Sequence, residues 1–349
     1  MQEISLLDLN REELGELIAS FGEPAYRASQ IYGWLYRSLA TDFSQMTNLP
    51  KILREELAQS AYIPTLKPLE ELVSSSGLTR KVLFELRDGE TIESVLMLYQ
   101  RRQTVCVSTQ VGCAFGCPFC ATGQTGFTRN LSAGEILEQV LHFARFLREK
   151  GEHLTNVVFM GMGEPLANYD ATWQAIGRLH DPEGFGLGSR RLTLSTVGLV
   201  PGIERLSQES LPIGLAISLH SADNSLRDEL VPINRKYPLG ELMGACRKYV
   251  ERTGRRLTIE YVLIDGINDT PWHAWKLAEL LQSLPCHINL IPLNPTPDPT
   301  FRPSPRKKAL AFQAELDRSN VQYTFRLGRG LDIQAGCGQL RGKPKPKGS

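Results

Sequence analysis

The sequence predicts an α/β fold in which about six strand–helix units form a parallel sheet curled into a partial barrel, preceded by a helical unit and a β-hairpin. Three observations lead to this prediction. Helical patterns fill roughly the first 60 residues, an Asp-Gly turn signal stands at Asp88-Gly89, and from Thr104 onward apolar β-branched runs alternate with helical ones. With 349 residues, of which 42% are hydrophobic and 22% charged, the chain can bury such a core without disulfide bonds.

Residues 1–62 are predicted to form an N-terminal helical accessory domain. Helical periodicity covers 11–20, 24–37 and 49–59. In the second helix, an apolar stripe is formed by Tyr26, Ile31, Trp34 and Leu35. We expect this stripe to face the core, and a face that docks nucleic acid is the alternative.

Residues 63–103 are predicted to form a β-hairpin extension. The runs 81–86 and 91–99 alternate apolar and polar residues, and the strong hairpin signal Asp88-Gly89 joins them.

Residues 104–330 are predicted to form the partial barrel. Strands are expected at 104–110, 156–160, 191–196, 214–220, 257–264 and 287–293, and helices at 132–150, 169–180, 201–207, 239–252, 271–284 and 305–319. In folds of this kind, reactive groups collect on the loops that follow the carboxyl ends of the strands.

Composition excludes several classes of protein. The 39 Lys and Arg against 38 Asp and Glu leave a net charge of +1, so nothing indicates a globally basic nucleic-acid binder. No stretch approaches the roughly 18 to 20 apolar residues of a membrane-spanning helix, and we expect no membrane association. Seven cysteines, an odd number, and a beginning that does not resemble a secretory signal favour a reducing cytoplasm.

A cysteine triplet follows the first expected barrel strand. Cys113, Cys117 and Cys120 form a C-x3-C-x2-C pattern within one loop. Thiolates prefer zinc or iron–sulfur clusters to hard cations. A structural zinc normally has four protein ligands, and no fourth Cys or His follows in this loop, so an iron–sulfur centre is favoured over zinc.

This pattern, placed after the first strand of a partial barrel, resembles the signature of radical S-adenosylmethionine (SAM) enzymes. The resemblance implies that Cys113, Cys117 and Cys120 hold a [4Fe-4S] cluster whose fourth iron chelates SAM. The segment Gly161-Met162-Gly163-Glu164-Pro165 is similar to the one that binds the SAM amino group in that superfamily. A plain glycine turn is the alternative, and a dinucleotide motif is excluded because its third glycine would fall on Leu166.

Polar residues close the later strands of the predicted barrel. Ser195 closes the third strand, Ser218-Leu219-His220 the fourth, and Asn294 the sixth. We expect them to bind ribose and carboxylate groups of SAM at the barrel rim. Taken singly, each is better explained as a polar group that ends a strand, and only together do they favour a binding site.

The other four cysteines divide into two pairs. Alternation along the first strand places Val105 and Val107 toward the helices and Cys106 toward the barrel interior, and a buried thiol without a role in the reaction is the alternative for Cys106. Cys337 stands in a glycine-rich segment, where a mobile thiol suits a carrier or nucleophile. Cys246 and Cys286 are expected to be core residues.

Longer motifs narrow the resemblance to the RlmN/Cfr family of radical SAM RNA methyltransferases. They are the triplet loop continued to Gly123, then Gly126-Phe127-Thr128-Arg129-Asn130-Leu131, and the terminal Ala335-Gly336-Cys337-Gly338-Gln339-Leu340. One departure is Gly336, where the family usually has alanine. Another is Leu331, which replaces a commonly acidic residue.

The resemblance implies methylation of adenine carbon 2 in 23S rRNA and in tRNA next to the anticodon. One SAM would methylate Cys337, and a second would be cleaved at the cluster to activate that methyl group for addition to the base. Cys106 would then resolve the protein–RNA adduct by forming a disulfide with Cys337. Glu93 matches the family's proton acceptor, and pairing with Arg80 or Lys81 is the alternative for this carboxylate.

Two other hypotheses about the reaction stay open. A Cfr-like methylation of carbon 8 is one, and a radical SAM enzyme acting on a peptide or small molecule is another. We expect a monomer that receives electrons from a donor such as flavodoxin or ferredoxin. Residues 331–349 would form the methyl-carrier cysteine loop and a basic tail, and phosphate contacts are expected from Arg101, Arg102, 302–308 and the tail lysines.

Overall fold

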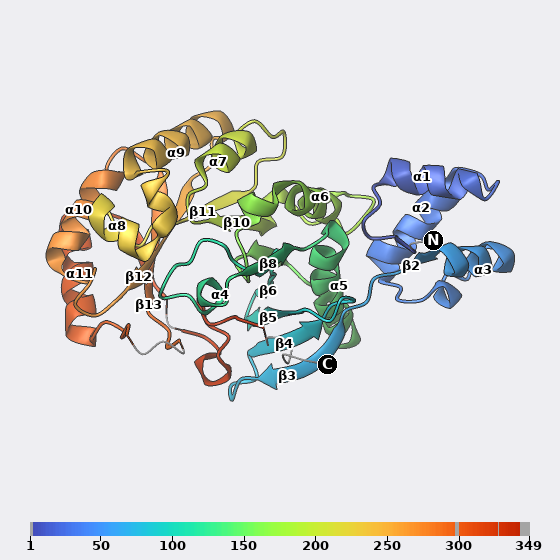
Figure 1. Cartoon of the computed structure of the whole chain (residues 1–349), viewed down its shortest axis with the longest axis horizontal. Coiled ribbons are helices and arrows are strands. Elements are labelled where there is room, and N and C mark those ends of the chain that lie inside the picture. The colour runs from blue at the N-terminus through green and yellow to red at the C-terminus, as the bar shows by residue number, and fades with distance from the viewer. Residues whose placement is uncertain (1–2, 297–299, 327, 343–349) are drawn as a thin grey trace.

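A ten-stranded sheet forms the centre of the molecule. The computed structural model describes residues 3–296, 300–326 and 328–342. The strand order is β14-β13-β12-β11-β10-β9-β6-β5-β4-β3. All pairings from β6 to β14 are parallel, whereas β3, β4, β5 and β6 pair antiparallel. Helices cover the outside of the parallel strands, and the N-terminal helices stand at one end of the molecule (Figure 1).

The six predicted barrel strands are present, with a seventh at the edge. They are β6 (Arg102–Cys106), β9 (Asn156–Phe159), β10 (Leu192–Thr196), β11 (Gly214–Ser218), β12 (Leu257–Leu263), β13 (Cys286–Pro292) and the unpredicted β14 (Tyr323–Phe325). The first strand ends at Cys106, earlier than expected, because the chain then turns and Gln110–Gly112 (β7) pairs instead with Phe127–Asn130 (β8). Strands such as β12 are buried on both faces, as helix-covered parallel sheets require.

The six predicted helices of this part are also present. They are α5 (Ala133–Glu149), α6 (Tyr169–His180), α7 (Val200–Leu206), α9 (Leu239–Thr253), α10 (Pro271–Leu281) and α11 (Arg306–Arg318). A capping box between Ser132 and Glu135 starts α5, and one side of that helix is buried against the sheet. Short elements escaped the sequence analysis: α4 (Ala121–Gln124), α8 (Asn224–Leu230), η3 (Pro165–Asn168), η4 (Ser189–Arg191), η5 (Pro232–Arg235) and η6 (Leu331–Ile333).

The predicted hairpin extends the same sheet. Strands β4 (Thr79–Glu85) and β5 (Thr91–Tyr99) pair antiparallel on either side of the Asp88-Gly89 turn, and β5 pairs in turn with β6. Strand β3 (Lys67–Val73), which we did not predict, forms the edge. Its charged, mostly exposed side chains and its bulge suit a protected sheet edge.

The N-terminal unit contains the expected helices. Its elements are α1 (Arg11–Ser20), α2 (Tyr26–Gly33), η1 (Trp34–Ser38), η2 (Phe43–Gln45), α3 (Lys51–Ser60) and the short parallel pair β1 (Ile4–Ser5) and β2 (Ala61–Tyr62). In the apolar stripe, Ile31 and Leu35 are buried as a core face, whereas Tyr26 is 54% exposed. Contacts tie this unit to the rest: the Asp8 carboxylate accepts from the backbone N–H of Gly134 at the start of α5.

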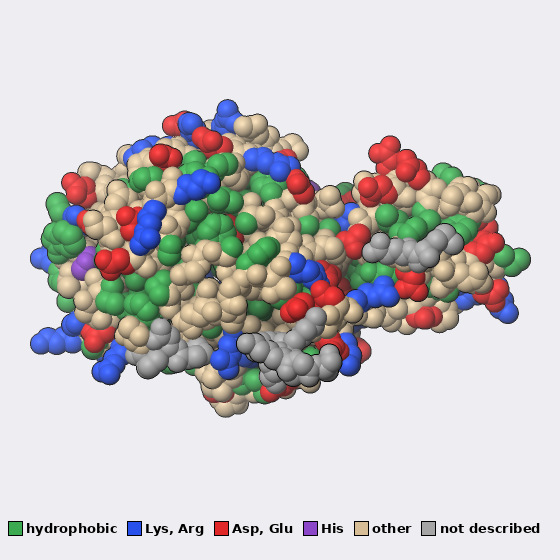
Figure 2. Space-filling view, viewed as in Figure 1, with side chains coloured by type: hydrophobic (Ala, Val, Ile, Leu, Met, Phe, Trp, Pro, Cys, Tyr) green, Lys and Arg blue, Asp and Glu red, His purple; other side chains and the backbone are tan. Residues whose placement is uncertain are grey.

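Surface charge agrees with the near-neutral composition. On the face in Figure 2, acidic and basic side chains are intermixed over the sheet-containing part, and acidic side chains gather over the N-terminal helices. Among the described residues, no helix is long and apolar enough to cross a membrane. Residues 343–349, which include the tail lysines, lie outside the described residues.

Candidate functional site

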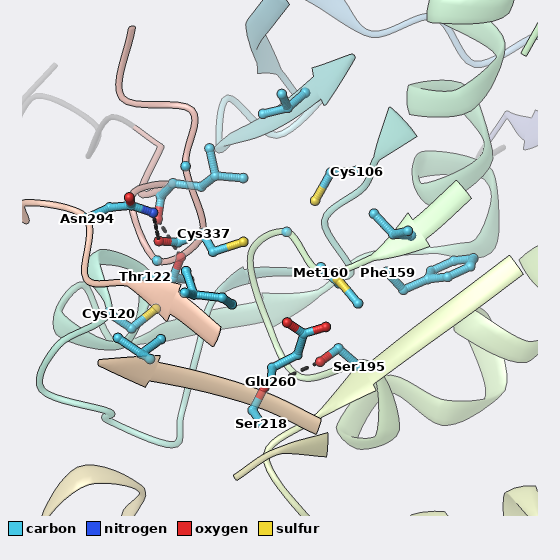
Figure 3. A pocket seen from close by; sticks show the side chains of 18 of the residues that line it. Cys106, Cys120, Thr122, Phe159, Met160, Ser195, Ser218, Glu260, Asn294 and Cys337 are labelled. Atoms are coloured by element: carbon cyan, nitrogen blue, oxygen red, sulfur yellow. Dashed lines mark hydrogen bonds between the residues drawn. The ribbon is translucent and has the colours of Figure 1, made fainter. Parts of the chain in front are cut away.

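A cavity of about 330 Å³ runs along one face of the parallel strands and includes the loops at their carboxyl ends. Strands β6 and β9 to β13 contribute residues to it, as does the loop between β7 and β8. The C-terminal segment forms another wall, so that residues far apart in the sequence face one another (Figure 3). The predicted reactive groups line the cavity at the carboxyl ends of the strands, whereas Arg102 and Asn156 line it at the amino ends.

The three cysteines of the triplet all line this cavity. The loop folds back on itself, with the N–H of Cys120 donating to the carbonyl of Cys117 at 3.1 Å and that of Cys113 to Gly126 at 2.7 Å. All three thiols are free of disulfide bonds. Burial raises the pKa of Cys113 to about 12 and that of Cys117 well above the usual value, with the neighbouring thiols adding to the effect for Cys117.

This donor set fits an iron–sulfur cluster better than a zinc ion. Among the described residues, no three His, Cys, Asp or Glu side chains are arranged to hold one metal ion. Thiolates on a tetrahedral zinc, each about 2.3 Å from the metal, would lie within about 4 Å of one another. Three soft thiol ligands on one cavity suit an iron–sulfur centre, whereas a structural zinc normally takes a fourth protein ligand.

The segment after β9 places a buried carboxyl group beside the triplet. The N–H of Glu164 donates to Oε1 of Gln110 at 2.8 Å, and its carboxylate accepts from the N–H groups of Leu166 and Val197. Burial raises the pKa of Glu164 to about 7. Gly163 and Glu164 both line the cavity, so the structure brings this predicted segment to the predicted cysteines.

Polar strand-end residues complete this side of the cavity. The hydroxyls of Ser195 and Ser218 lie 3.3 Å apart on neighbouring strands (Figure 3). His220 is buried, accepts from the N–H of Val262 through Nδ1, and has its pKa lowered by burial to about 3, which keeps the ring neutral. Asn294 donates to the carbonyl of Cys337 at 3.0 Å.

Cys106 and Cys337, the two further cysteines predicted for the site, face the same cavity from opposite sides (Figure 3). Cys106 points inward from β6 while Val105 and Val107 are fully buried on the other face, as the alternation predicted. Burial raises the pKa of Cys106 to about 12, and the Cys337 thiol adds to this rise. Burial also raises the pKa of Cys337, although its side chain is exposed to the open cavity. The expected core residue Cys246 is fully buried, and Cys286 is half-buried.

Two residues expected in the site do not line the cavity. The side chain of Leu219 is fully buried in the core, and its backbone N–H donates to the carbonyl of Glu260. Glu93 is buried on β5, where Oε1 pairs with Nζ of Lys81 at 2.9 Å and Oε2 accepts from the N–H of Arg341 at 2.9 Å. The predicted alternative of pairing with Lys81 is therefore realised, and the C-terminal segment covers the carboxylate.

Two charged residues of the cavity escaped the sequence analysis. Glu260 on β12 is buried, accepts from Asn289 at 2.8 Å and points into the cavity (Figure 3). Burial raises its pKa. Arg326 follows β14, the strand that was not predicted. Strand alternation could have identified Glu260, because it shares a face with Thr258 and Val262, which also line the cavity.

Comparisons with known proteins match nearly the whole chain. Residues 4–63 match the ribosomal RNA large subunit methyltransferase N-terminal domain, and residues 107–281 match the radical SAM superfamily. The "probable dual-specificity RNA methyltransferase RlmN" of Chloroflexus aurantiacus is 51% identical, over 98% of this chain and 94% of that protein. The protein of the same name from Moorella thermoacetica is 50% identical, over 97% of each chain. A crystal structure of a radical SAM methyltransferase from Sphaerobacter thermophilus is 53% identical and superposes with a TM-score of 0.94, over 97% of this chain and 99% of the other.

Proposed function

Since the chain belongs to the RlmN family of radical SAM methyltransferases, we propose that it methylates carbon 2 of an adenine in 23S rRNA and of the adenine next to the anticodon in some tRNAs. The observation that carries this proposal is a single cavity lined by five cysteines from three separate parts of the chain. We infer that β6 and β9 to β13 form a partial barrel of six strand–helix units around it. Residues 1–62 would be an accessory domain, 63–103 an extension, 104–330 the barrel and 331–349 the carrier loop and tail.

The superfamily's cofactors, a [4Fe-4S] cluster and SAM, suit the residues at this cavity. We propose that Cys113, Cys117 and Cys120 hold the cluster. When bound, the two cofactors supply an electron, the methyl group and the radical that activates it. The residues that would contact SAM are Gly163, Glu164, Ser195, Ser218, Leu219 through its backbone, His220 and Asn294.

Three residues of the chain would carry the methyl group and complete its transfer. Cys337 holds the group as a thioether, and the carbon derived from it bonds to C2 of the adenine, which joins protein and RNA. Glu93 removes the proton from C2. The unpaired electron that the addition leaves on the adenine ring would return to the bound cofactors, so that an even-electron thioether joins Cys337 to the base. The sulfur of Cys106 loses its proton and attacks the sulfur of Cys337. The carbon–sulfur bond breaks, its electron pair passes to the transferred carbon, and that carbon takes up a proton to become the methyl group.

This last step leaves a disulfide between Cys106 and Cys337, which a cellular thiol reductant must reopen. Burial raises the pKa of Cys106 to about 12, so this thiol must give up its proton before it attacks. Both thiols already face one cavity, as this step requires.

A cationic rim beside the cavity supports an RNA substrate. The guanidinium of Arg102 lies 4.4 Å from the ring centre of Tyr99, and that of Arg329 lies 4.2 Å from the same ring. Both arginines are exposed, and Tyr99 and Arg102 line the cavity. Such a rim suits phosphate contacts and stacking of a base splayed from single-stranded RNA. By contrast, Lys308, one of the expected phosphate contacts, pairs with Asp265 at 2.7 Å.

The proposal extends to partners and location. An outside protein such as flavodoxin or ferredoxin would supply the electron. One chain lines the whole cavity, so the site needs no second copy and a monomer suffices. The seven cysteines are all unpaired, which supports a reducing cytoplasm.

Mapping methylated adenines in RNA treated with the purified enzyme tests this function. We expect 2-methyladenine in 23S rRNA. Modification at carbon 8 would instead identify a Cfr-like enzyme, and unmodified RNA would favour a radical SAM enzyme with a peptide or small-molecule substrate.

A variant separates the proposed role of Cys106 from general damage. Cys106→Ala should trap the covalent protein–RNA adduct, visible on a denaturing gel, because the resolving thiol is gone. Cys286→Ala is the matched control, since Cys286 lies outside the cavity and should leave no adduct. Free product at an undiminished rate from Cys106→Ala would contradict the assigned role.

A further inference from the structure

We propose that Lys81 is a positioning residue that keeps Glu93 ready to accept a proton and links it to the loop carrying Cys337. This inference rests on the proposed function, in which Glu93 is the proton acceptor. It assigns a role to a residue that does not itself line the cavity.

Lys81 and Glu93 lie on the same face of the antiparallel pair β4 and β5. In the register of that pair, Lys81 is opposite Val95 and Leu83 is opposite Glu93, so the two charged residues are diagonal neighbours. Their side chains are 8% and 9% exposed, and Nζ lies 2.9 Å from Oε1. Val95, on the same face, lines the cavity. The ion pair is therefore buried directly beside the proposed reaction site.

The C-terminal segment closes over this ion pair on both sides of Cys337. Before the cysteine, the carbonyl of Gln334 accepts from Nζ of Lys81 at 3.2 Å. After it, the N–H of Arg341 donates to Oε2 of Glu93 at 2.9 Å. One ammonium group thus contacts both the proton acceptor and the carrier loop. Both carboxylate oxygens of Glu93 are occupied by partners in this arrangement.

These contacts have two chemical consequences. A carboxylate buried without a cationic partner takes up a proton rather than remain charged, and a carboxyl group that already holds a proton cannot accept another. Lys81 therefore preserves Glu93 as a base. Because the N–H of Arg341 occupies Oε2, the C-terminal segment must also move before Glu93 can reach a substrate, so movement of the carrier loop and exposure of the base are coupled.

The test compares Lys81→Met with Lys81→Arg and Glu93→Gln in the cluster-loaded enzyme with RNA. Proton transfer typically contributes about 10²- to 10⁴-fold to a rate, and we expect Lys81→Met to slow product formation by about tenfold to hundredfold. Mass spectrometry should still find S-methylated Cys337, and a denaturing gel should show accumulated protein–RNA adduct, as for Glu93→Gln. Lys81→Arg should restore most of the rate, because arginine keeps the charge.

Two controls separate this role from a structural one. Lys67→Met removes a lysine that pairs with Glu85 across the neighbouring strands at 2.7 Å. This ion pair is far more exposed than that of Lys81 and Glu93, so the variant should behave as wild type. Removing both buried charges in Lys81→Met/Glu93→Gln avoids an unpaired charge, so this protein should fold even where Lys81→Met does not. Its product rate should equal that of Glu93→Gln alone, since Lys81 acts through Glu93.

The outcomes distinguish the two levels of the proposal. Adduct accumulation in Glu93→Gln together with a wild-type rate in Lys81→Met would overturn the role of Lys81 and leave the function intact. A double variant clearly slower than Glu93→Gln would also overturn it, because Lys81 would then act independently. Absence of adduct in Glu93→Gln, with product formed normally, would instead remove Glu93 from the proposed function.

Discussion

Replacing Gly163 by alanine tests whether the loop after β9 has the close contacts that place Glu164. Gly163 has a φ of +97°, and a Cβ built there would lie 2.5 Å from Cβ of Gln110 and 2.8 Å from its backbone nitrogen. The backbone atom cannot turn away as a flexible side-chain end could. The N–H of Glu164 is bonded to the same Gln110 side chain, so the clash would disturb the carboxyl group as well.

Two costs add at this position. A left-handed conformation costs a residue with a side chain about 1 to 2 kcal/mol, and overfilling a tight site costs about 1 to 3 kcal/mol. Gly163→Ala should therefore lower the free energy of unfolding by about 2 to 5 kcal/mol. Gly151→Ala is the matched control, because Gly151 also has a positive φ of +71° but no atom within 4 Å of its added Cβ. It should show the conformational cost alone.

Urea unfolding of both variants and of the wild type measures the difference, and calorimetric titration with SAM measures the effect on binding by the cluster-loaded protein. We expect Gly163→Ala to be less stable than Gly151→Ala by about 1 to 3 kcal/mol and to bind SAM more weakly. Equal stability of the two variants would refute the contact argument. Unchanged SAM affinity would refute the link from Gly163 to the cofactor site.

Two further predictions concern the cationic rim beside the cavity and the buried carboxyl group of Glu138. Arg102→Ala and Arg329→Ala should each weaken RNA binding and reduce the slope of log affinity against log salt concentration by about 1. Lys308→Ala removes a lysine already paired with Asp265 and should change this slope little. Filter binding at several salt concentrations measures the slope for each variant. Burial raises the pKa of the Glu138 carboxyl group to about 7. The folded protein therefore binds a proton at Glu138 more tightly than the unfolded chain does, and it loses stability as the pH rises from about 4.5 to 7. Glu138→Gln should therefore be more stable relative to wild type at pH 8 than at pH 5, by up to about 3 kcal/mol, and a pH-independent difference in urea unfolding would refute this assignment.

Much of the fold could be predicted because its signals are local. Apolar β-branched runs marked six strands, and the Asp88-Gly89 turn marked the hairpin. Elements without such signals escaped prediction. Strand β3 carries charged side chains along an exposed edge, and β14 has three residues, so pairing with neighbours decides their conformation rather than local sequence.

The candidate site was predictable to the extent that alternation and spacing determine it. The alternation of side chains along the strand correctly predicted that Cys106 faces the cavity. The same alternation, applied to Ser218-Leu219-His220, would have placed Leu219 in the core, on the face opposite its polar neighbours. No local pattern could place the C-terminal segment. The contact of Arg341 with Glu93 joins distant parts of the chain and depends on tertiary structure alone.

In the proposed reaction the thiols of Cys106 and Cys337 must come together, and the bonds that hold each of them indicate which one moves. Cys106 belongs to a strand that pairs with β5 on one side and β9 on the other, so a full ladder of hydrogen bonds fixes it. The loop of Cys337 is held by separate bonds, including those from Asn294 to Cys337 and from Ala121 to Gly338. A disulfide requires the sulfurs to approach to about 2 Å, so the loop closes the gap. Gly336 lets Asn294 reach the backbone there, because a Cβ at this position would lie 2.5 Å from the Asn294 amide nitrogen. Gly336 therefore lies at the contact that this loop would have to release for Cys337 to move toward Cys106, as the proposed function requires.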